Sequence, residues 1–202
     1  MQDDRALLAR LRAGEQEAFD TLVNRYDASL RRVARAFVRT PSAADDVVQE
    51  TWLAVIRGLD GFEGRSSLST WMFSILANRA RTRGTRDARV VPFSGLDLDD
   101  EPAVDPEAFG SDGRWRSAPP RLDADPEAHL LSKELRGQVL AAVEELSPAQ
   151  RAVMTLRDLA GLGAEEVCSV LEITDGNQRV LLHRARANVR AALAPLVEVG
   201  TR

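Results

Sequence analysis

Residues 174–190 read T-D-G-N-Q-R-V-L-L-H-R-A-R-A-N-V-R, a short turn followed by a helical pattern. Four arginines project from this helix, and no acidic residue follows Asp175 within the stretch. Val180 and Leu182 begin the apolar side that would anchor it. Residues 164–171, just before it, form a second short helical pattern. Two short helices joined by a tight turn, the second rich in arginine, predict a helix-turn-helix that faces a polyanion.

Charge is distributed unevenly along the 202 residues, whose formal net charge is −4. Residues 1–89 carry fifteen basic against twelve acidic side chains, and residues 90–130 carry three against ten. In residues 131–202 the two kinds are balanced at nine each. The acidity is concentrated in one central segment, so both flanking segments remain candidates for contact with nucleic acid.

Several kinds of site are not expected from this composition. The single cysteine, Cys168, permits no intramolecular disulfide and no cysteine-based zinc site. His129 and His183 lie far apart, so we expect neither a metal nor a cofactor. No apolar run reaches the roughly 20 residues of a membrane span, and the N-terminus is too acidic for a signal peptide. We therefore expect a cytoplasmic protein without direct membrane insertion.

Hydrophobic periodicity predicts four helices in the first 89 residues. The first is expected over residues 3–13 and the second over residues 15–39. The third would begin at Ser42, with Asp45 in a capping-box-like position, and the fourth at Ser66 or Ser67. The apolar stripe of the second helix is Phe19, Leu22, Val23, Tyr26, Leu30, Val33 and Phe37, and that of the third is Val48, Trp52, Val55, Ile56 and Leu59.

One face of the third helix is acidic. Asp46 and Glu50 lie four residues apart, as do Asp45 and Gln49, so these side chains crowd neighbouring surface. Acids in the first turn of a helix favour its dipole. A solvated face and a partner-binding face are both consistent with this spacing.

The fourth helix ends in an arginine-rich segment, in which residues 78–86 read N-R-A-R-T-R-G-T-R. Arginines near a helix C-terminus favour the helix dipole. The same set suits a DNA strand, because arginine holds phosphates, Asn78 can read a base edge and Trp71 can stack on an unpaired base. The preceding loop, residues 60–65, reads D-G-F-E-G-R and is expected to expose Phe62.

Residues 90–125 break the pattern, because proline, glycine and acidic residues dominate them and helical periodicity is lacking. Trp115 within this segment has no assigned role. Helices resume over residues 126–145 and after Ser147-Pro148, and the helix-turn-helix follows. The predicted fold class is all-α, with two helical domains joined by a flexible acidic linker. The domains expected are residues 1–89, a linker over 90–129, and residues 130–202 with the helix-turn-helix.

Two separated stretches together resemble a known family. D-D-V-V-Q-E-T-W-L-A-V-I from Asp45 and F-E-G-R-S-S-L-S-T-W-M-F-S-I-L-A-N from Phe62 resemble the second conserved region of bacterial sigma factors of the extracytoplasmic-function group. L-S-P-A-Q-R-A-V-M-T-L-R-D-L-A-G-L from Leu146, through H-R-A-R at His183, resembles their fourth region. The occurrence of both stretches in this order, with a linker between them, is highly specific for this family.

The resemblance implies an alternative sigma factor of the sigma-70 family, which is not an enzyme. Such a factor binds core RNA polymerase, recognises the −35 and −10 promoter elements and promotes strand opening. The implied partners are promoter DNA, the largest and second-largest polymerase subunits, and an anti-sigma factor. The acidic face matches the D-x-x-Q-E pattern that binds the clamp helices of the largest subunit. Its residues are Asp45, Asp46, Gln49 and Glu50.

DNA contacts implied by the resemblance fall in both domains. The loop before the fourth helix, with Asn78, would capture a flipped −10 base, and arginines would grip the backbone. The −10 residues are Phe62, Arg65, Ser66, Trp71, Asn78, Arg79, Arg81 and Arg83. The −35 residues are Arg157, Asn177, Gln178, Arg179, Val180, His183, Arg184 and Arg186. Where many members read G-T-V-K-S-R-L, this chain reads G-N-Q-R-V-L-L, so a −35 preference is not transferred.

Two other functions compete with this interpretation. A helix-turn-helix repressor or activator would bind duplex DNA without polymerase, and it would leave the acidic face without a role. A nucleic-acid-processing enzyme would need carboxylates clustered with histidine or cysteine, which the sequence does not offer.

Overall fold

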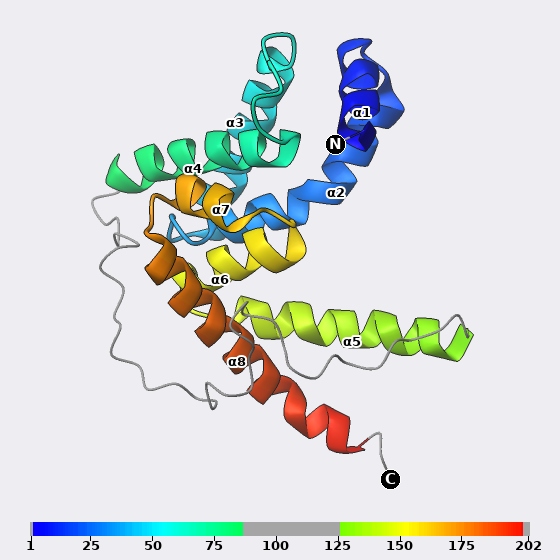
Figure 1. Ribbon diagram of the computed structural model, residues 1–202, viewed down its shortest axis with the longest axis vertical. Coiled ribbons are helices and arrows are strands. Elements are labelled where there is room, and N and C mark those ends of the chain that lie inside the picture. The colour runs from blue at the N-terminus through cyan, green and yellow to red at the C-terminus, as the bar shows by residue number, and fades with distance from the viewer. Residues whose placement is uncertain (1, 87–125, 200–202) are drawn as a thin grey trace.

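The computed structural model of the protein describes residues 2–86 and 126–199, and every regular element in these two ranges is helical. Figure 1 shows the first four helices gathered at one end and the later elements at the other. The expected all-α fold class is confirmed. The prediction of a linker falls mainly on residues 87–125, with Trp115, which lie outside the described residues. Residues 126–129, assigned to the linker, belong to a helix.

The first module consists of four helices whose approximate positions agree with the sequence. They are α1 (Gln2–Arg12), α2 (Gln16–Ala34), α3 (Pro41–Gly58) and α4 (Leu68–Arg86). The second helix ends earlier than expected. The Ser42 cap is wrong, because Oγ1 of Thr40 accepts the backbone N–H of Ala43 at 3.2 Å and Pro41 takes the first helical position. Ser67 begins α4 as expected, since its Oγ accepts the N–H of Thr70 at 3.1 Å.

The core of the first module lies between α2, α3 and α4, with α1 packed on α2. Phe73 is fully buried and meets Tyr26 edge-on, with 6.3 Å between ring centroids. Two residues of the predicted stripes lie outside this core, since Val23 is 38% exposed and Ile56 is 52% exposed. On α3 the buried side instead includes Val47, so the helix is turned by about one position from the orientation that the sequence suggested.

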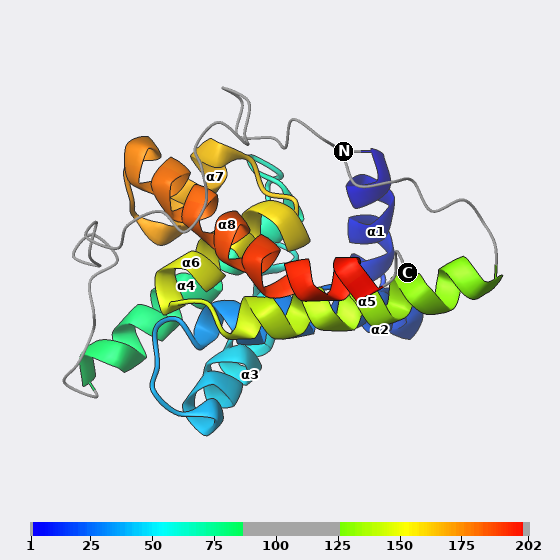
Figure 2. The same ribbon diagram turned by 90° about the horizontal axis from the view of Figure 1, so that it is seen from below.

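The second module is built from α5 (Pro126–Glu144), α6 (Pro148–Met154), a π-helical turn η3 (Thr155–Leu159), α7 (Ala164–Leu171) and α8 (Asp175–Val199). The long α8 packs across both α5 and α6 (Figure 2). The predicted helix-turn-helix is formed by α7 and α8. Glu172 ends α7 in the left-handed region at φ 57°, and Thr174 caps α8 by accepting the N–H of Asn177 at 3.2 Å.

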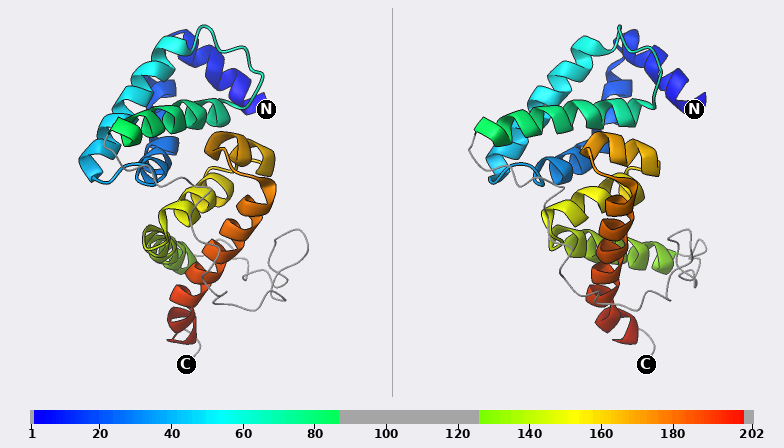
Figure 3. Two further views of the ribbon diagram at one scale, coloured as in Figure 1. Left: turned by 90° about the vertical axis from the view of Figure 1, so that its left-hand side faces the viewer. Right: turned by 60° about the vertical axis from the view of Figure 1, so that its left-hand side comes forward.

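The two modules pack directly against each other. Helix α7 lies beside α4, and η3 and α6 lie against α2. Both views of Figure 3 show α7 next to α4. The sequence pattern predicted two domains and gave no contact between them, so this packing is a new feature of the structure.

Candidate nucleic-acid interface

The acidic face of α3 is engaged by arginines from two neighbouring helices. Asp46 Oδ2 lies 2.8 Å from Arg83 Nη2. Glu50 lies 3.3 Å from Arg79 and 3.7 Å from Arg83, counted between charged atoms. Gln49 is exposed beside them. Two of the arginines predicted to hold −10 DNA are therefore paired with two of the acids predicted to hold a partner.

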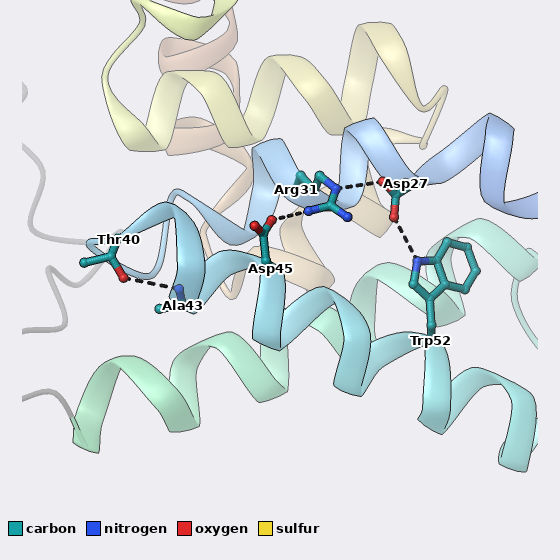
Figure 4. A network of polar contacts seen from close by, with 6 residues as sticks. All are labelled: Asp27, Arg31, Thr40, Ala43, Asp45 and Trp52. Carbon is teal, nitrogen blue, oxygen red and sulfur yellow. Dashed lines mark hydrogen bonds and ion pairs between the residues drawn. The ribbon is translucent and has the colours of Figure 1, made fainter.

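Asp45 differs from the other acids because it faces α2. Figure 4 shows Arg31 of α2 lying between Asp27 and Asp45 and pairing with both. Asp27 also accepts the indole N–H of Trp52 at 3.1 Å. The hydrogen bond to Asp27 raises the pKa of Arg31 despite its partial burial, and Asp45 raises it further. Asp45 thus helps to fasten α3 to α2.

Arg81 points away from Arg79 and Arg83, towards the second module. Its Nη2 donates to the carbonyl oxygen of Val170 at 2.6 Å, and its Nη1 lies 2.8 Å from Glu172. Burial lowers the pKa of Arg81, and the Glu172 carboxylate opposes this shift. The three arginines predicted to grip one DNA strand therefore lie on two different surfaces.

The aromatic pair of the predicted −10 site is already assembled. The rings of Phe62 and Trp71 lie 4.9 Å apart between centroids, so the expectation of an exposed Phe62 is wrong. Gly58 permits the position of Trp71, because a Cβ at residue 58 would come within 2.9 Å of the indole ring. Ser66 and Arg65 are exposed on the same loop, and Arg65 pairs with Glu63 at 3.1 Å.

Arg12 holds this loop in place and is the functional candidate that the sequence patterns did not indicate. It donates to the carbonyl oxygens of Leu59 at 3.0 Å and Phe62 at 2.6 Å. An arginine at the end of a short helix carries no signal that marks such contacts, because its partners lie about 50 positions away in the sequence.

On the helix-turn-helix, Arg179 and Val180 are exposed at the start of α8, and Asn177 is half-buried beside them. Arg179 is 76% exposed in its side chain and pairs with Asp175 at 2.7 Å. His183 and Arg184 are half-buried one turn later. The N-terminal turns of α8 thus present a polar and basic surface, as a recognition helix requires.

Three other predicted −35 residues do not share this exposed surface. Gln178 is 2% exposed and packs inside the module. Arg157 donates to the carbonyl oxygen of Leu162 at 2.6 Å. Arg186 forms a two-pronged pair with Asp158 at 2.9 and 2.7 Å, and its side chain is largely buried. All three contribute contacts within the second module.

The modules are joined at the start of α4. Glu166 of α7 accepts hydrogen bonds from Oγ1 of Thr70 at 2.6 Å and from the N–H of Gly163 at 2.7 Å, with Ser67 Oγ at 3.4 Å. Burial raises the pKa of Glu166, but these hydrogen bonds outweigh it and hold the pKa below its ordinary value. The predicted −10 helix is therefore in direct contact with the helix-turn-helix.

A second junction joins α2 to α5. Glu144 lies 3.0 Å from Arg32 on α2 and 3.1 Å from Arg35, the residue that follows α2. These pairs are partly buried, so solvent screens them less than exposed ones. We call this packing of the two modules against each other the closed arrangement. Polar contacts hold it at two junctions, one between α4 and α7 and one between α2 and α5.

Within the described ranges, no three histidine, cysteine or acidic side chains are grouped so that they could hold a metal ion. Burial raises the pKa of the Cys168 thiol, and the Asp175 carboxylate adds to this effect. The thiol is therefore protonated at neutral pH and is a poor nucleophile. None of the helices described here is long and apolar enough to cross a membrane.

Comparisons with known proteins agree along most of the chain. Residues 22–90 match Sigma-70 region 2, and residues 136–189 match Sigma-70, region 4. The chain is 33% identical over 195 residues to the ECF RNA polymerase sigma-E factor of Escherichia coli (strain K12), covering 96% of each protein. It is 30% identical over 196 residues to the RNA polymerase sigma-H factor of Pseudomonas aeruginosa, covering 97% of this chain and 96% of that protein.

A solved structure shares the fold. The sigma factor RpoE from Bartonella quintana, in complex with the anti-sigma factor NepR, is 23% identical with a TM-score of 0.50. The match covers 87% of this chain and 96% of that one.

Proposed function

The chain belongs to the extracytoplasmic-function group of sigma-70 factors and acts in promoter recognition and transcription initiation, and we propose how its residues divide this work. The acidic face of α3 docks on core RNA polymerase, the loop before α4 with Asn78 captures a −10 base, and the start of α8 reads the −35 element. The chain supplies no catalytic group, since the polymerase performs the chemistry. It acts in the cytoplasm, where polymerase and promoter lie.

The observation that carries this proposal is the set of ion pairs between α3 and α4. Asp46 and Glu50 face core polymerase in the proposal, while Arg79 and Arg83 face DNA, and the structure pairs them with each other. A basic surface on core polymerase would replace the arginines as partner of the acids. The arginines would then be released to bind phosphates. Exposed ion pairs of this kind contribute only about 0–1 kcal/mol each, so the exchange costs little.

This exchange links the two binding events. If docking on polymerase frees the arginines for DNA, then DNA bound to the arginines must strengthen docking by the same factor, because linkage is reciprocal. The free chain would bind DNA weakly and the complex with polymerase would bind it well. A regulator that binds DNA without polymerase gives no reason for such pairing.

For the −35 element we propose a smaller set of contacts than the sequence suggested. Asn177, Arg179 and Val180 occupy the first two turns of α8, where recognition helices touch base edges. His183 and Arg184 follow one turn later on the same helix. Gln178 supports the packing of the module and does not belong to this set.

Promoter reading requires the modules to separate. Elements centred about 25 base pairs apart lie about 85 Å apart on straight DNA, at about 3.4 Å per base pair. Arg81 instead holds α4 within hydrogen-bonding distance of Val170 at the end of α7. The closed arrangement therefore belongs to the free chain. An anti-sigma factor that keeps the modules together would be a partner of the kind seen with RpoE of Bartonella quintana.

Transcription with purified core polymerase tests the proposal. We expect the chain to form a complex with core polymerase and to produce run-off transcripts from a subset of a promoter library. Failure to bind core polymerase, combined with protection of duplex DNA by the chain alone, would instead identify a repressor or activator. Within the active complex, Asn78→Ala should reduce permanganate reactivity at −10 and leave core binding unchanged.

A further inference from the structure

Arg12 closes the C-terminal end of α3 from a different helix. Its Nε donates to the carbonyl oxygen of Leu59, the C-cap residue of α3, and its Nη2 donates to that of Phe62. A third carbonyl, that of Asp60, lies 3.5 Å from Nη2. The last carbonyls of a helix lack partners within the helix, and a cation there also matches the helix dipole. One guanidinium thus satisfies the end of α3 and the loop that follows.

The backbone that Arg12 holds carries the aromatic residue of the proposed −10 site. Phe62 is the last residue of this segment. Its N–H donates to the carbonyl oxygen of Leu59 at 3.3 Å, and its ring lies against Trp71. Gly64 then turns the chain with φ at 72°. The position of the Phe62 ring is therefore set by a backbone segment whose carbonyls are fixed from α1.

A pocket opens between α1 and this loop. It has a volume of about 300 Å³ and is lined by Leu8, Ala9, Arg12, Phe62, Glu63 and Gly64. Helix α1 therefore forms one wall beside the loop, and Arg12 both lines the pocket and binds its opposite wall. Without Arg12 the two walls would lose their polar link.

We propose that Arg12 is a positioning residue for strand opening, which acts by holding the backbone at residues 59–62 in the form that receives an unpaired −10 base. This inference rests on the proposed role of the Phe62 loop. A loop that is ordered before the base arrives does not lose conformational freedom when it binds. Arginine suits this task because its planar fork reaches two carbonyls at once, whereas the ammonium group of lysine cannot reproduce that geometry.

The attachment of α1 to the module does not depend on the Arg12 guanidinium. Leu11 is buried, and Leu7 and Leu8 pack against the core. Arg12 itself is exposed overall. Removal of its head group should therefore leave the module folded and change the loop alone.

Three variants test this role in the complex with core polymerase. Arg12→Gln removes the fork, Arg12→Lys keeps the charge, and Arg10→Gln is the matched control on the same helix, since Arg10 pairs with Glu15 at 2.6 Å and not with the loop. We expect Arg12→Gln to slow −10 opening, followed by 2-aminopurine fluorescence, about tenfold, the order expected for two lost hydrogen bonds. The opening rate with Arg12→Lys should lie between the rates with Arg12→Gln and with the unmodified chain. The opening rate with Arg10→Gln should equal that of the unmodified chain. Core affinity should be unchanged in all three variants.

A double-mutant cycle with Phe62→Ala separates this role from a general loss of stability. If Arg12 acts through the loop, Arg12→Gln in the Phe62→Ala background should cause no further loss of opening. Additive losses, or normal opening by Arg12→Gln, would overturn the inference about Arg12. Normal opening by Phe62→Ala alone would instead overturn the proposed role of the loop, so the two failures are distinguishable.

Discussion

Thr70 on α4 donates a hydrogen bond from Oγ1 to Glu166 on α7, and 2.6 Å separate the two oxygens. Thr70 is buried at the start of the proposed −10 helix, and Glu166 also caps the first helix of the helix-turn-helix through Gly163. The contact therefore joins the two proposed DNA-reading surfaces. It must break when they read separate promoter elements.

Thr70→Val should favour separation of the modules. Valine keeps the size of the side chain and removes the donor, so the Glu166 carboxylate loses a charge-assisted hydrogen bond worth about 1.5–3 kcal/mol. We expect a larger radius of gyration by small-angle X-ray scattering and tighter binding to core polymerase. Thr21→Val is the control, because Thr21 donates only within its own helix, to Glu17. An unchanged radius for Thr70→Val would show that this contact does not hold the modules together.

The closed arrangement should also depend on pH through Glu166. Burial raises the pKa of Glu166, but hydrogen bonds from Thr70, Gly163 and Ser67 hold it below the ordinary value of a glutamate. The Thr70 and Ser67 donors come from the other module, so these two hydrogen bonds of the closed arrangement favour the charged carboxylate. The stabilisation is fully present above that ordinary pKa and is lost as the pH falls through the lower folded value. Fluorescence transfer between labels on the two modules should therefore decrease in this acidic range. In Glu166→Gln that step should disappear, and its persistence would assign the pH dependence to another carboxyl group.

The sequence predicted the helices well because their signals are local. Apolar spacing located α2 and α4, and a serine or threonine beside proline marked the starts of α3 and α6 to within two residues. The error at Ser42 is informative, since Thr40 and Ser42 both lie beside Pro41 and only the backbone geometry at Thr40 selects the cap.

The misplaced site residues depend on packing between distant segments. Gln178 follows the basic pattern of α8, but its burial is decided by how α8 is rotated against α6 and α7. Arg81 lies two residues from Arg79, so helix geometry alone points it to the other side of α4, but only the packing of α7 supplies its partners there. No sequence pattern marks Arg12 as a residue that contacts the loop. Periodicity describes one helix at a time and carries no information about such contacts.

If the acids of α3 compete with DNA for the arginines of α4, then removing these acids should strengthen DNA binding. Asp46→Asn with Glu50→Gln should free Arg79 and Arg83, so the isolated chain should bind a single-stranded −10 oligonucleotide about two- to fivefold more tightly, as expected for weak exposed pairs. Its affinity should also fall more steeply with salt, because more phosphates are neutralised. The same variant should bind core polymerase more weakly.

Net charge alone would also improve DNA binding, so a charge-matched control is needed. Glu17→Gln with Asp20→Asn changes the net charge equally on α2, where Asp20 accepts from Gln16 and neither acid contacts Arg79 or Arg83. Equal gains in the two double variants, measured by fluorescence anisotropy, would contradict the exchange and leave only a long-range effect of charge.

Gln178 and Arg179 are neighbours with opposite environments, and this contrast gives a test of the −35 surface. The Gln178 Nε2 is buried without a hydrogen-bond partner among the described residues, so Gln178→Met should keep or raise the melting temperature, because it removes an unsatisfied polar group at similar volume. Its −35 selectivity should be unchanged. Arg179→Ala should leave the melting temperature unchanged and weaken −35 binding by about 1–3 kcal/mol if it reads a base. Loss of selectivity by Gln178→Met, with normal selectivity of Arg179→Ala, would mean that α8 presents a different face to DNA.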